Sequence, residues 1–369
     1  MANLNGPVET VDVNQPINLQ QVFAGKRVFL TGHTGFKGAW LCLLLNKLGA
    51  QVYGYALPPA TQPSLFMLAG VADTLAGHHL ADVRNEAALA CAMQAARPDL
   101  VLHLAAQALV RQSYADPATT WSTNVMGTVN LLEAVRVCPS VRAALVVTTD
   151  KCYQNMQWPW GYRENDKLGG EDPYSASKAG TELVAHSYRS SFFARNGPLL
   201  ATARAGNVIG GGDWSADRLL PDAVRAMQNA EILRIRHPNA TRPWQHVLEP
   251  LHGYLLLAAR LLEGDASCAQ AYNFGPEAAD NLAVHEVLKG LATYWPGLRW
   301  QAEADAQSLH EASLLYLDSS KARRELHWPT RWSLDAGLQH TAQWYTQAAS
   351  KPQAIRQFTE QQLELFLHD

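Results

Sequence analysis

The chain has 369 residues, 47% of them hydrophobic, which is more than one hydrophobic core usually serves, so we expect two lobes. Its 30 basic and 33 acidic residues leave a formal charge of -3, which gives no electrostatic reason to expect nucleic acid or an anionic membrane surface as a partner. The longest apolar runs, such as 41–45 and 255–259, are far shorter than the roughly 20 residues that span a bilayer. The five cysteines are scattered without a Cys-x-x-Cys pair, which argues against a disulfide framework or a zinc site and favours the cytoplasm. These properties favour a small-molecule partner.

The order of the apolar segments predicts the fold. Residues 1–24 are polar, with no positively charged stretch before an apolar run, so we expect a flexible N-terminal arm and no secretory signal. Short apolar runs then alternate with stretches that carry apolar residues at helical spacing. The expected strands are 27–31, 51–56, 99–104, 144–149 and 199–205, and the expected helices are 38–48, 85–96, 118–136 and 174–193. This alternation is typical of a Rossmann-type doubly wound parallel α/β sheet over residues 25–205.

The alternation weakens after residue 205. Glycines 210–212 and several prolines interrupt mixed segments, which indicates a smaller mixed α/β lobe over residues 206–246 and 276–369. Residues 247–263 have a helical pattern and 270–274 an extended one, so we expect 247–275 to return to the first lobe. The domain boundary is therefore predicted to be interleaved.

A glycine-rich loop follows the first predicted strand. It has the pattern Gly32-x-x-Gly35-x-x-Gly38, includes Phe36, and leads into an apolar helix. Such glycines allow a tight turn, close approach of the backbone to a pyrophosphate and tight packing of helix on strand, and the helix N-terminus favours the anion. We therefore predict a dinucleotide site, the alternative being an ordinary glycine turn.

The adenosine end departs from the usual pattern, because Ala56 stands where an acid would hold the 2′-hydroxyl of NAD. His33 and Lys37 are predicted near that ribose, where positive charge would tolerate a 2′-phosphate, so NAD and NADP both remain open. The alternative is that both side chains merely face solvent. Asp82, followed by Val83, is predicted to bond the adenine amine, with a helix N-cap as its alternative.

Two groups of reactive side chains follow. Tyr174 and Lys178 lie four residues apart, which puts a phenol and an ammonium on one face of a helix. The ammonium and a positive nicotinamide ring would lower the pKa of the phenol and make it a usable base. The fourth predicted strand ends in Thr149, Asp150 and Lys151, so a hydroxyl, an acid and an amine come side by side.

These pieces resemble the extended short-chain dehydrogenase/reductase family over about residues 25–345. The matching strings are 31–38, "HLAAQ" at 103–107, "NVMGT" at 124–128, Thr149, and Tyr174 with Lys178. The strings "TGHTGFKGAW", "TTDKCY", "WGYREND", "RAGNVIGGGDW" and "RPWQHVLEP" look like the CDP-glucose 4,6-dehydratase branch of that family. That resemblance implies a tightly held NAD, reduced and reoxidised within each turnover as hydride moves from C4 to C6, and the product CDP-4-keto-6-deoxyglucose plus water. It implies no metal.

The resemblance also assigns binding residues. The cofactor would be lined by Leu104, Ala105, Ala106, Gln107 and Asn124, as well as by Thr149, Tyr174 and Lys178. CDP-glucose would be held by Asn207, Arg218, Arg242 and His246, with Arg111 at the hexose and His310 and Glu311 at the nucleotide. Surface positions for the arginines and a core position for His246 are the alternatives. Helices 118–136 and 174–193 would pair across a two-fold axis in a homodimer.

A dehydratase needs proton handlers beyond the tyrosine. The resemblance implies that Tyr174, with Thr149 and Lys178, deprotonates the 4-hydroxyl, and that Asp150 protonates the departing 6-hydroxyl. Related dTDP-glucose dehydratases have a glutamate as the C5 base where this chain has Lys151. Lys151 is then either the base or a charge that holds Asp150 or the enolate, and an exposed salt bridge between the two neighbours is the remaining alternative. Rival functions are a sugar-nucleotide epimerase or reductase and a non-catalytic dinucleotide-binding regulator.

Overall fold

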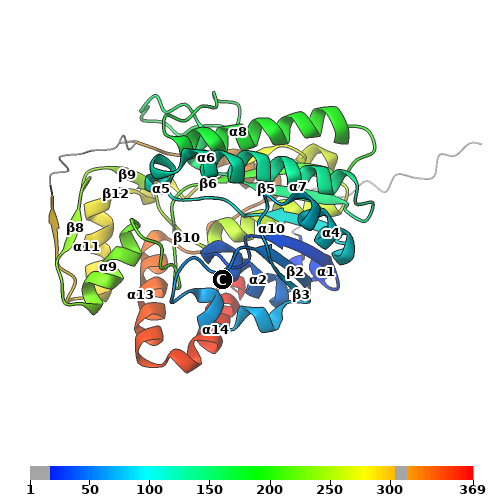
Figure 1. Cartoon of the computed structure of the whole chain (residues 1–369). Coiled ribbons are helices and arrows are strands. Elements are labelled where there is room, and N and C mark those ends of the chain that lie inside the picture. Colours follow the sequence, from blue (N-terminus) through cyan, green and yellow to red (C-terminus); the bar gives the residue numbers. More distant parts are fainter. Residues whose placement is uncertain (1–16, 304–313, 369) are drawn as a thin grey trace, which may run out of the picture.

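The protein is described by a computed structural model, which covers residues 17–303 and 314–368. Its centre is a seven-stranded sheet in the order β11-β6-β5-β4-β1-β2-β3, in which every pair of neighbours is parallel (Figure 1). The strands are β1 (Arg27–Thr31), β2 (Gln51–Ala56), β3 (Gly77–Leu80), β4 (Leu100–His103), β5 (Ala143–Val147), β6 (Leu199–Ala205) and β11 (Ala271–Phe274). This order confirms the predicted Rossmann-type fold, with β11 added beside β6.

Both faces of the sheet are covered, which explains why its central strands read as continuous apolar runs. Along β1, Val28 and Leu30 join the core on one face and Phe29 joins the core on the other. The first face is covered by α1 (Leu19–Phe23), α2 (Phe36–Lys47) and α10 (Leu248–Leu262), and the second by α4 (Glu86–Ala96), α7 (Gly127–Arg136) and α8 (Pro173–Tyr188). Residues 247–275, predicted to return to the first lobe, thus contain α10 against the sheet and β11 within it.

The predicted arm differs from the structure at its end. Leu19 and Phe23 of α1 are buried in the core beside α10, and Asn18 caps the helix by accepting a hydrogen bond from Gln21 N. Residues 19–23 are therefore part of the folded domain, because the two apolar side chains are four apart and fall on one helix face.

The two long helices predicted for 118–136 and 174–193 each contain a π-helical turn. The first begins as α6 (Pro117–Trp121), which follows α5 (Val110–Ala115), and passes through a π turn at Ser122–Met126 before α7. The second, α8, ends in a π turn at Arg189–Phe193. Asp116 and Asp172 are the N-caps of α6 and α8. A proline follows each cap in the first turn, where a backbone N–H would find no partner within the helix, so its absence costs no hydrogen bond.

The second lobe is built from short strand pairs and helices. Its strands are β7 (Val208–Ile209), β8 (Leu233–Ile235), β9 (Thr241–Pro243), β10 (Gln245–His246), β12 (Asn281–Ala283) and β13 (Trp300–Ala302). Its helices are α9 (Leu219–Gln228), α11 (Val284–Tyr294), α12 (Ser320–Leu326), α13 (Leu334–Ser350) and α14 (Ile355–His368), and a short α3 (Leu65–Leu68) lies in the first lobe. Within the described residues, no helix combines the length and the apolar character needed to cross a membrane.

A single core joins the two lobes. The Trp40 indole on α2 donates a hydrogen bond to Gly211 O at 2.9 Å, and Trp344 on α13 packs on the same glycine. A Cβ on Gly211 would lie 1.9 Å from Trp344 Cγ, so only glycine fits between the helices. This contact fixes the second lobe against the carboxyl edge of the sheet.

Candidate active site

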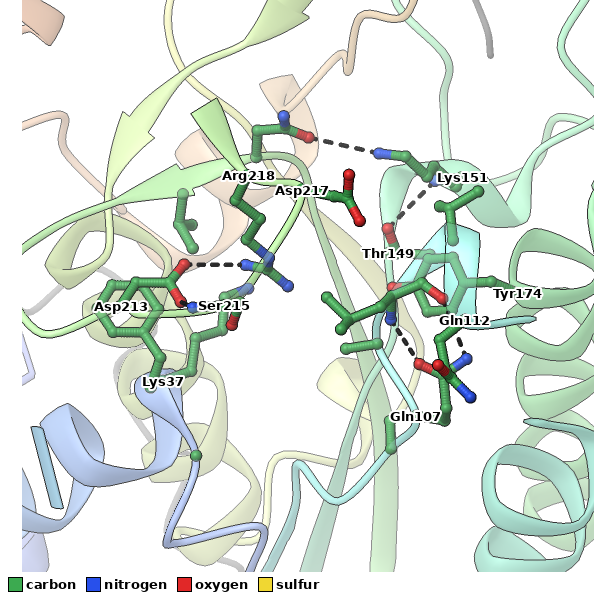
Figure 2. A pocket seen from close by; sticks show the side chains of 18 of the residues that line it. Lys37, Gln107, Gln112, Thr149, Lys151, Tyr174, Asp213, Ser215, Asp217 and Arg218 are labelled. Atoms are coloured by element: carbon green, nitrogen blue, oxygen red, sulfur yellow. Dashed lines mark hydrogen bonds and ion pairs between the residues drawn. The ribbon is translucent and has the colours of Figure 1, made fainter. Parts of the chain in front are cut away.

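The main cleft opens at the carboxyl ends of the sheet strands and has a volume of about 1050 Å³. It extends from the loop after β1, past the ends of β4 and β5, to α9 and β8 of the second lobe. The loops after β1 and β4 diverge there because the strand order reverses at this point, which is where open α/β sheets bind ligands. Figure 2 shows Thr149, Lys151 and Tyr174 on one side of the cleft, and Lys37, Asp213 and Arg218 on the other.

The glycine loop has the geometry of a phosphate cradle. Gly32 has φ +78°, and a Cβ there would lie 2.7 Å from Ala105 N, while a Cβ on Gly38 would lie 2.1 Å from Gly32 O. Gly35 is the N-cap of α2, and no side chain caps this helix, so its first N–H groups remain available to an anion. The loop thus fits the diphosphate of a dinucleotide, and Phe36 and Gly38 also line the cleft.

His33 does not lie where it was predicted. Its side chain is fully buried, its Nε2 lies 2.8 Å from His78 Nδ1, and its ring packs edge-on against Phe66. Burial, followed by the neighbouring His78, lowers the pKa of His33 to about 4. The prediction of a positive His33 beside the adenosine ribose is therefore wrong, because the ring points under β2 at Gly54 and away from the cleft.

Lys37 lines the cleft, but its hydrogen-bond partner is on α10 and not at the end of β2. Its Nζ donates a hydrogen bond to Tyr254 Oη at 3.4 Å. Burial, and next the positive charge of Arg218, lowers the pKa of Lys37 to about 7, while the Asp150 carboxylate opposes that shift. The placement of Lys37 beside the ribose is thus wrong, because the side chain leaves the first turn of α2 toward α10.

At the end of β2 the cleft is lined by Ala56, Leu57 and Pro58, with Asp82 and Val83 after β3. The Asp82 carboxylate accepts hydrogen bonds from the Arg84 backbone and side chain, and these hydrogen bonds hold the pKa of Asp82 below its usual value. Asp82 is not the N-cap of α4, since Asn85 caps that helix. Asp82 therefore lines the adenosine end of the cleft and does not cap α4.

Leu104, Ala105, Ala106 and Gln107, predicted at the cofactor, line the cleft after β4, but Asn124 does not. Asn124 is buried, accepts a hydrogen bond from Gln107 N at 2.8 Å and donates to Gln107 O and to Ser177 Oγ. Its placement in the cofactor contact is corrected to a structural role, because its amide is occupied in tying the loop after β4 to α8.

The catalytic turn is a 3₁₀ helix at Asp150–Cys152 whose N-cap is Thr149. Predicted strand 144–149 ends at Val147, because the Thr149 hydroxyl accepts a hydrogen bond from Lys151 N and turns the chain. Asp150 is fully buried; its Oδ1 accepts a hydrogen bond from Thr149 Oγ1 at 2.8 Å, and its Oδ2 accepts none from the described residues. Asp150 thus lines the cleft with one buried carboxylate oxygen that has no hydrogen-bond donor among the described residues.

Lys151 joins two sides of the cleft. Its Nζ lies 3.6 Å from Asp150 Oδ1 and donates to Asn207 Oδ1 at 3.4 Å. The exposed salt bridge considered for the pair is wrong, since Asp150 is fully buried and Lys151 is 24% exposed. Neighbours in a strand point in opposite directions, whereas the 3₁₀ turn lets these two side chains converge.

Tyr174 and Lys178 both line the cleft from α8, and their pKa values are governed by burial. Burial raises the pKa of Tyr174 to about 12, although a hydrogen bond with Thr149 opposes the shift. Burial lowers the pKa of Lys178 to about 8 against the attraction of Glu182, and Lys178 Nζ donates to Val147 O at 3.0 Å. The predicted lowering of the pKa of Tyr174 is therefore not produced by the chain's own groups, because desolvation of the phenolate outweighs the nearby hydroxyl.

Arg111, Asn207, Arg218 and Arg242, which were predicted to bind the substrate, all line the cleft. Arg218 pairs with Asp213 at 3.4 Å, and Arg242 donates to Thr241 O at 2.8 Å. Asp217, which was not among the predicted site residues, forms ion pairs with Arg111 at 3.7 Å and with Arg236 at 3.3 Å. The arginine-rich string around residue 234 and the acid beside Arg218 were the available signals.

His246 occupies the core position that was its alternative. It is fully buried, packs edge-on against Trp40 and Trp332, and does not line the cleft. Burial lowers its pKa to about 3. The substrate-binding assignment of His246 is therefore wrong, because alternation in β10 turns this side chain toward α13.

His310 and Glu311 lie outside the described residues. Among the described residues, no group of three or more His, Cys, Asp or Glu could hold a metal ion.

The chain is similar to known proteins over most of its length. A family model described as GDP-mannose 4,6 dehydratase matches residues 29–341. A CDP-glucose 4,6-dehydratase from Salmonella typhimurium is 47% identical over 327 residues, which is 87% of this chain and 90% of that protein. A dTDP-glucose 4,6-dehydratase from Xanthomonas campestris is 26% identical over 340 residues, 86% of this chain and 92% of that protein.

Solved structures share the fold at lower identity. An epimerase from Methanothermobacter thermautotrophicus has a TM-score of 0.78 at 21% identity and covers 92% of this chain and 96% of its own. A dTDP-glucose 4,6-dehydratase double mutant from Streptomyces venezuelae, solved with NAD bound, has a TM-score of 0.72 at 24% identity. The match covers 89% of this chain and 99% of that chain. The fold and the long sequence match together show that the chain belongs to the GDP-mannose 4,6-dehydratase family.

Proposed function

We propose that the protein catalyses the NAD-dependent 4,6-dehydration of CDP-glucose to CDP-4-keto-6-deoxyglucose and water. The observation that carries the proposal is the catalytic turn, which presents a buried acid, Asp150, and an ammonium, Lys151, beside Thr149 and Tyr174. A sugar-nucleotide epimerase needs only the hydroxyl, the phenol and Lys178, so the extra acid favours elimination of water. The 47% identity to a CDP-glucose 4,6-dehydratase supports the same substrate and reaction.

NAD would be held by the glycine loop at its diphosphate, by Asp82 and Val83 at its adenosine end, and by 104–107 along its length. When bound, NAD supplies the oxidising power that turns the C4 alcohol into a ketone and gives the same hydrogen back to the sugar. Since Ala56 offers no carboxylate at the ribose, and neither His33 nor Lys37 provides a cation there, the preference for NAD rests on the family resemblance.

Tyr174 is the proton acceptor for the 4-hydroxyl of the hexose. Burial raises the pKa of Tyr174 to about 12 in the chain alone, so Tyr174 accepts the proton only when Lys178 and a bound positive charge stabilise its phenolate. Lys178 Nζ is anchored to Val147 O at 3.0 Å, and Tyr174 lies one turn before Lys178 on α8. Oxidation at C4 then makes the C5 hydrogen acidic.

Asp150 and Lys151 handle the elimination. Asp150 Oδ2 accepts no hydrogen bond from the described residues, and in the protonated carboxyl form of Asp150 it would give its proton to the departing 6-hydroxyl. Lys151, 3.6 Å from Asp150 Oδ1 and bonded to Asn207, lies where an ammonium would stabilise the enolate at O4 or, once deprotonated, remove the C5 proton.

The cation-rich half of the cleft would bind the nucleotide diphosphate. Arg218 and Arg242 provide planar forks suited to phosphate oxygens, and Arg111 faces them from the first lobe. Asp213 and Asp217 hold two of these arginines in place. Recognition of the cytosine base rests on family resemblance alone.

The protein is also proposed to be a homodimer. Trp121, Met126, Leu183 and Phe192 are 43%, 51%, 59% and 52% exposed, and they lie on or beside α6, α7 and α8, which run side by side (Figure 1). Large apolar side chains on neighbouring helices are typical of a surface that another protein covers, and a second copy of the same helices is the occupant that the family implies. Light scattering of the purified protein, with Leu183→Glu as the disrupting variant, tests this.

The function is tested by incubating the purified protein with CDP-, dTDP-, UDP- and GDP-hexoses, with and without added NAD. We expect a product that is one water lighter than CDP-glucose and shows the alkaline absorbance of a 4-keto sugar. A product of unchanged mass would identify an epimerase instead. No turnover of any sugar nucleotide would favour the dinucleotide-binding regulator.

A further inference from the structure

A buried ion pair lies behind the catalytic turn. The Arg204 and Glu182 side chains are 4% and 3% exposed, and Arg204 Nη2 lies 2.8 Å from Glu182 Oε2. Glu182 is on α8, one turn after Lys178, and Arg204 is on β6. Burying two charges is unfavourable unless their hydrogen bonds are satisfied. Well-packed apolar residues at the same positions often stabilise a core as much as a buried ion pair does. Stability alone therefore does not explain this pair.

Glu182 connects α8 to the strand that carries the catalytic turn. Besides Arg204, its carboxylate accepts hydrogen bonds from Thr148 Oγ1 and, at 2.8 Å, from Thr202 Oγ1. Thr148 directly precedes Thr149. On the other side of Thr148, Val147 O accepts the hydrogen bond from Lys178 Nζ. The carboxylate thus fixes the start of the turn against the helix that bears Tyr174 and Lys178.

Arg204 holds the end of the turn. Its Nη1 donates to Tyr153 Oη at 2.8 Å and to Glu164 O at 3.0 Å, and its guanidinium lies 5.0 Å from the centre of the Tyr153 ring. Tyr153 directly follows the turn, lines the cleft, and donates to Asn273 Oδ1 at 2.7 Å. One ion pair therefore holds residues 148 and 153, which flank Thr149, Asp150 and Lys151.

We infer that Glu182 and Arg204 act as one positioning unit for the dehydration reaction, aligning the catalytic turn with Tyr174 and keeping Lys178 charged. The inference rests on the proposed function for its reaction. Neither residue lines the cleft, so neither is a catalytic residue in its own right.

The charges around Lys178 agree with this role. Burial lowers the pKa of Lys178 to about 8, and Glu182 provides the largest opposing attraction. The other titratable groups that interact with Lys178 are the Cys152 thiol, the Lys37 ammonium and the His103 imidazole. None of these is an acid that is ionised at neutral pH, since burial raises the pKa of Cys152 and lowers that of His103 to about 3.

Two threonines provide a matched test, because both donate to the Glu182 carboxylate and both are buried, but only Thr148 adjoins the turn. We expect Thr148→Val to lower kcat for CDP-glucose about tenfold with little change in KM, as for loss of one orienting hydrogen bond. Thr202→Val should keep kcat within about twofold of the wild-type value, although its thermal stability should fall as much as that of Thr148→Val. Equal kcat in the two variants would overturn the positioning role.

Glu182→Gln tests the charge. We expect the alkaline limb of the kcat–pH profile to move about one unit lower, because Lys178 loses the carboxylate that favours its protonated form. NMR titration of isotopically labelled lysines, with Lys178→Arg to assign the signal, should show the same shift in free protein, without turnover. An unmoved limb and an unmoved titration would overturn the electrostatic role. Should Glu182→Gln leave Arg204 unpaired and fail to fold, Glu182→Gln/Arg204→Gln replaces it.

The wild-type protein is assayed beside the variants. A wild type that is inactive on CDP-glucose would overturn the proposed function, and the NMR titration would still decide the charge role. An active wild type with unaffected variants would overturn only the inference about Glu182 and Arg204.

Discussion

The catalytic end and the arginine end of the cleft hold their charges in different ways. At the catalytic end, Asp150 is fully buried and Lys178 is 6% exposed, and burial governs the pKa values of Tyr174 and Lys178. At the arginine end, Asp217 is 44% exposed and joins Arg111 and Arg236, which are 38% and 32% exposed. Solvent weakens exposed pairs, whereas buried charges act at nearly full strength. Changes at the first end should therefore affect chemistry, and changes at the second should affect binding.

The largest effect expected at the buried end is that of Tyr174→Phe. Removing the phenol removes the base for the 4-hydroxyl, so kcat for the 4-keto product should fall about 10³-fold or more, at nearly unchanged KM. Tyr188→Phe is the matched control, since Tyr188 lies on the same helix but bonds Glu133 away from the cleft. Comparable losses in the two variants would mean that the phenol acts only through the stability of α8.

Lys151→Met should have the next largest effect. Removing the ammonium leaves Asp150 without its ion pair and the enolate without a cation, so kcat should fall about 10²-fold. Entry of solvent deuterium at C5 of the product tests whether Lys151 takes part in the mechanism. Exchange that slows with kcat fits either role, whereas undiminished exchange and turnover would remove Lys151 from the mechanism. Lys167→Met, on the exposed part of the following loop, is the control.

The pH profile should show the low pKa of Lys178. The pKa of about 8 means that Lys178 is charged at pH 7 and mostly neutral at pH 9. Because the phenolate of Tyr174 needs the cation, kcat should fall about tenfold from pH 7 to 9. Activity that stays constant up to pH 10 would show that Lys178 is not needed in its charged form.

The smallest effect is expected at the exposed end. Arg236→Gln should raise KM for CDP-glucose about threefold with kcat unchanged, and 0.5 M salt should reduce the difference between variant and wild type. Arg324→Gln, an exposed arginine on α12 outside the cleft, is the control. A large fall in kcat for Arg236→Gln would contradict the expectation that changes at the arginine end affect binding and not chemistry.

Sequence patterns predicted the site best where one short motif contains all of its members. The glycine loop and the Tyr174–Lys178 pair could be recognised because strand and helix periodicity fix the directions of those side chains. Side chains leaving loops and short strands have no such constraint. His33 and His246 were therefore assigned to ligands, while both lie buried against aromatic rings.

The amino-acid sequence by itself determined the parallel sheet, the phosphate loop and the presence of Thr149, Asp150, Lys151, Tyr174 and Lys178, because these depend on local spacing and on apolar periodicity. Only the tertiary structure decided which charges are buried and which groups surround them. The 3₁₀ turn made Asp150 and Lys151 converge, and residues distant in sequence joined Glu182 to Arg204 and Asp217 to Arg111. The physical reason is that desolvation and ion pairing depend on distance and burial, which spacing along the chain does not specify.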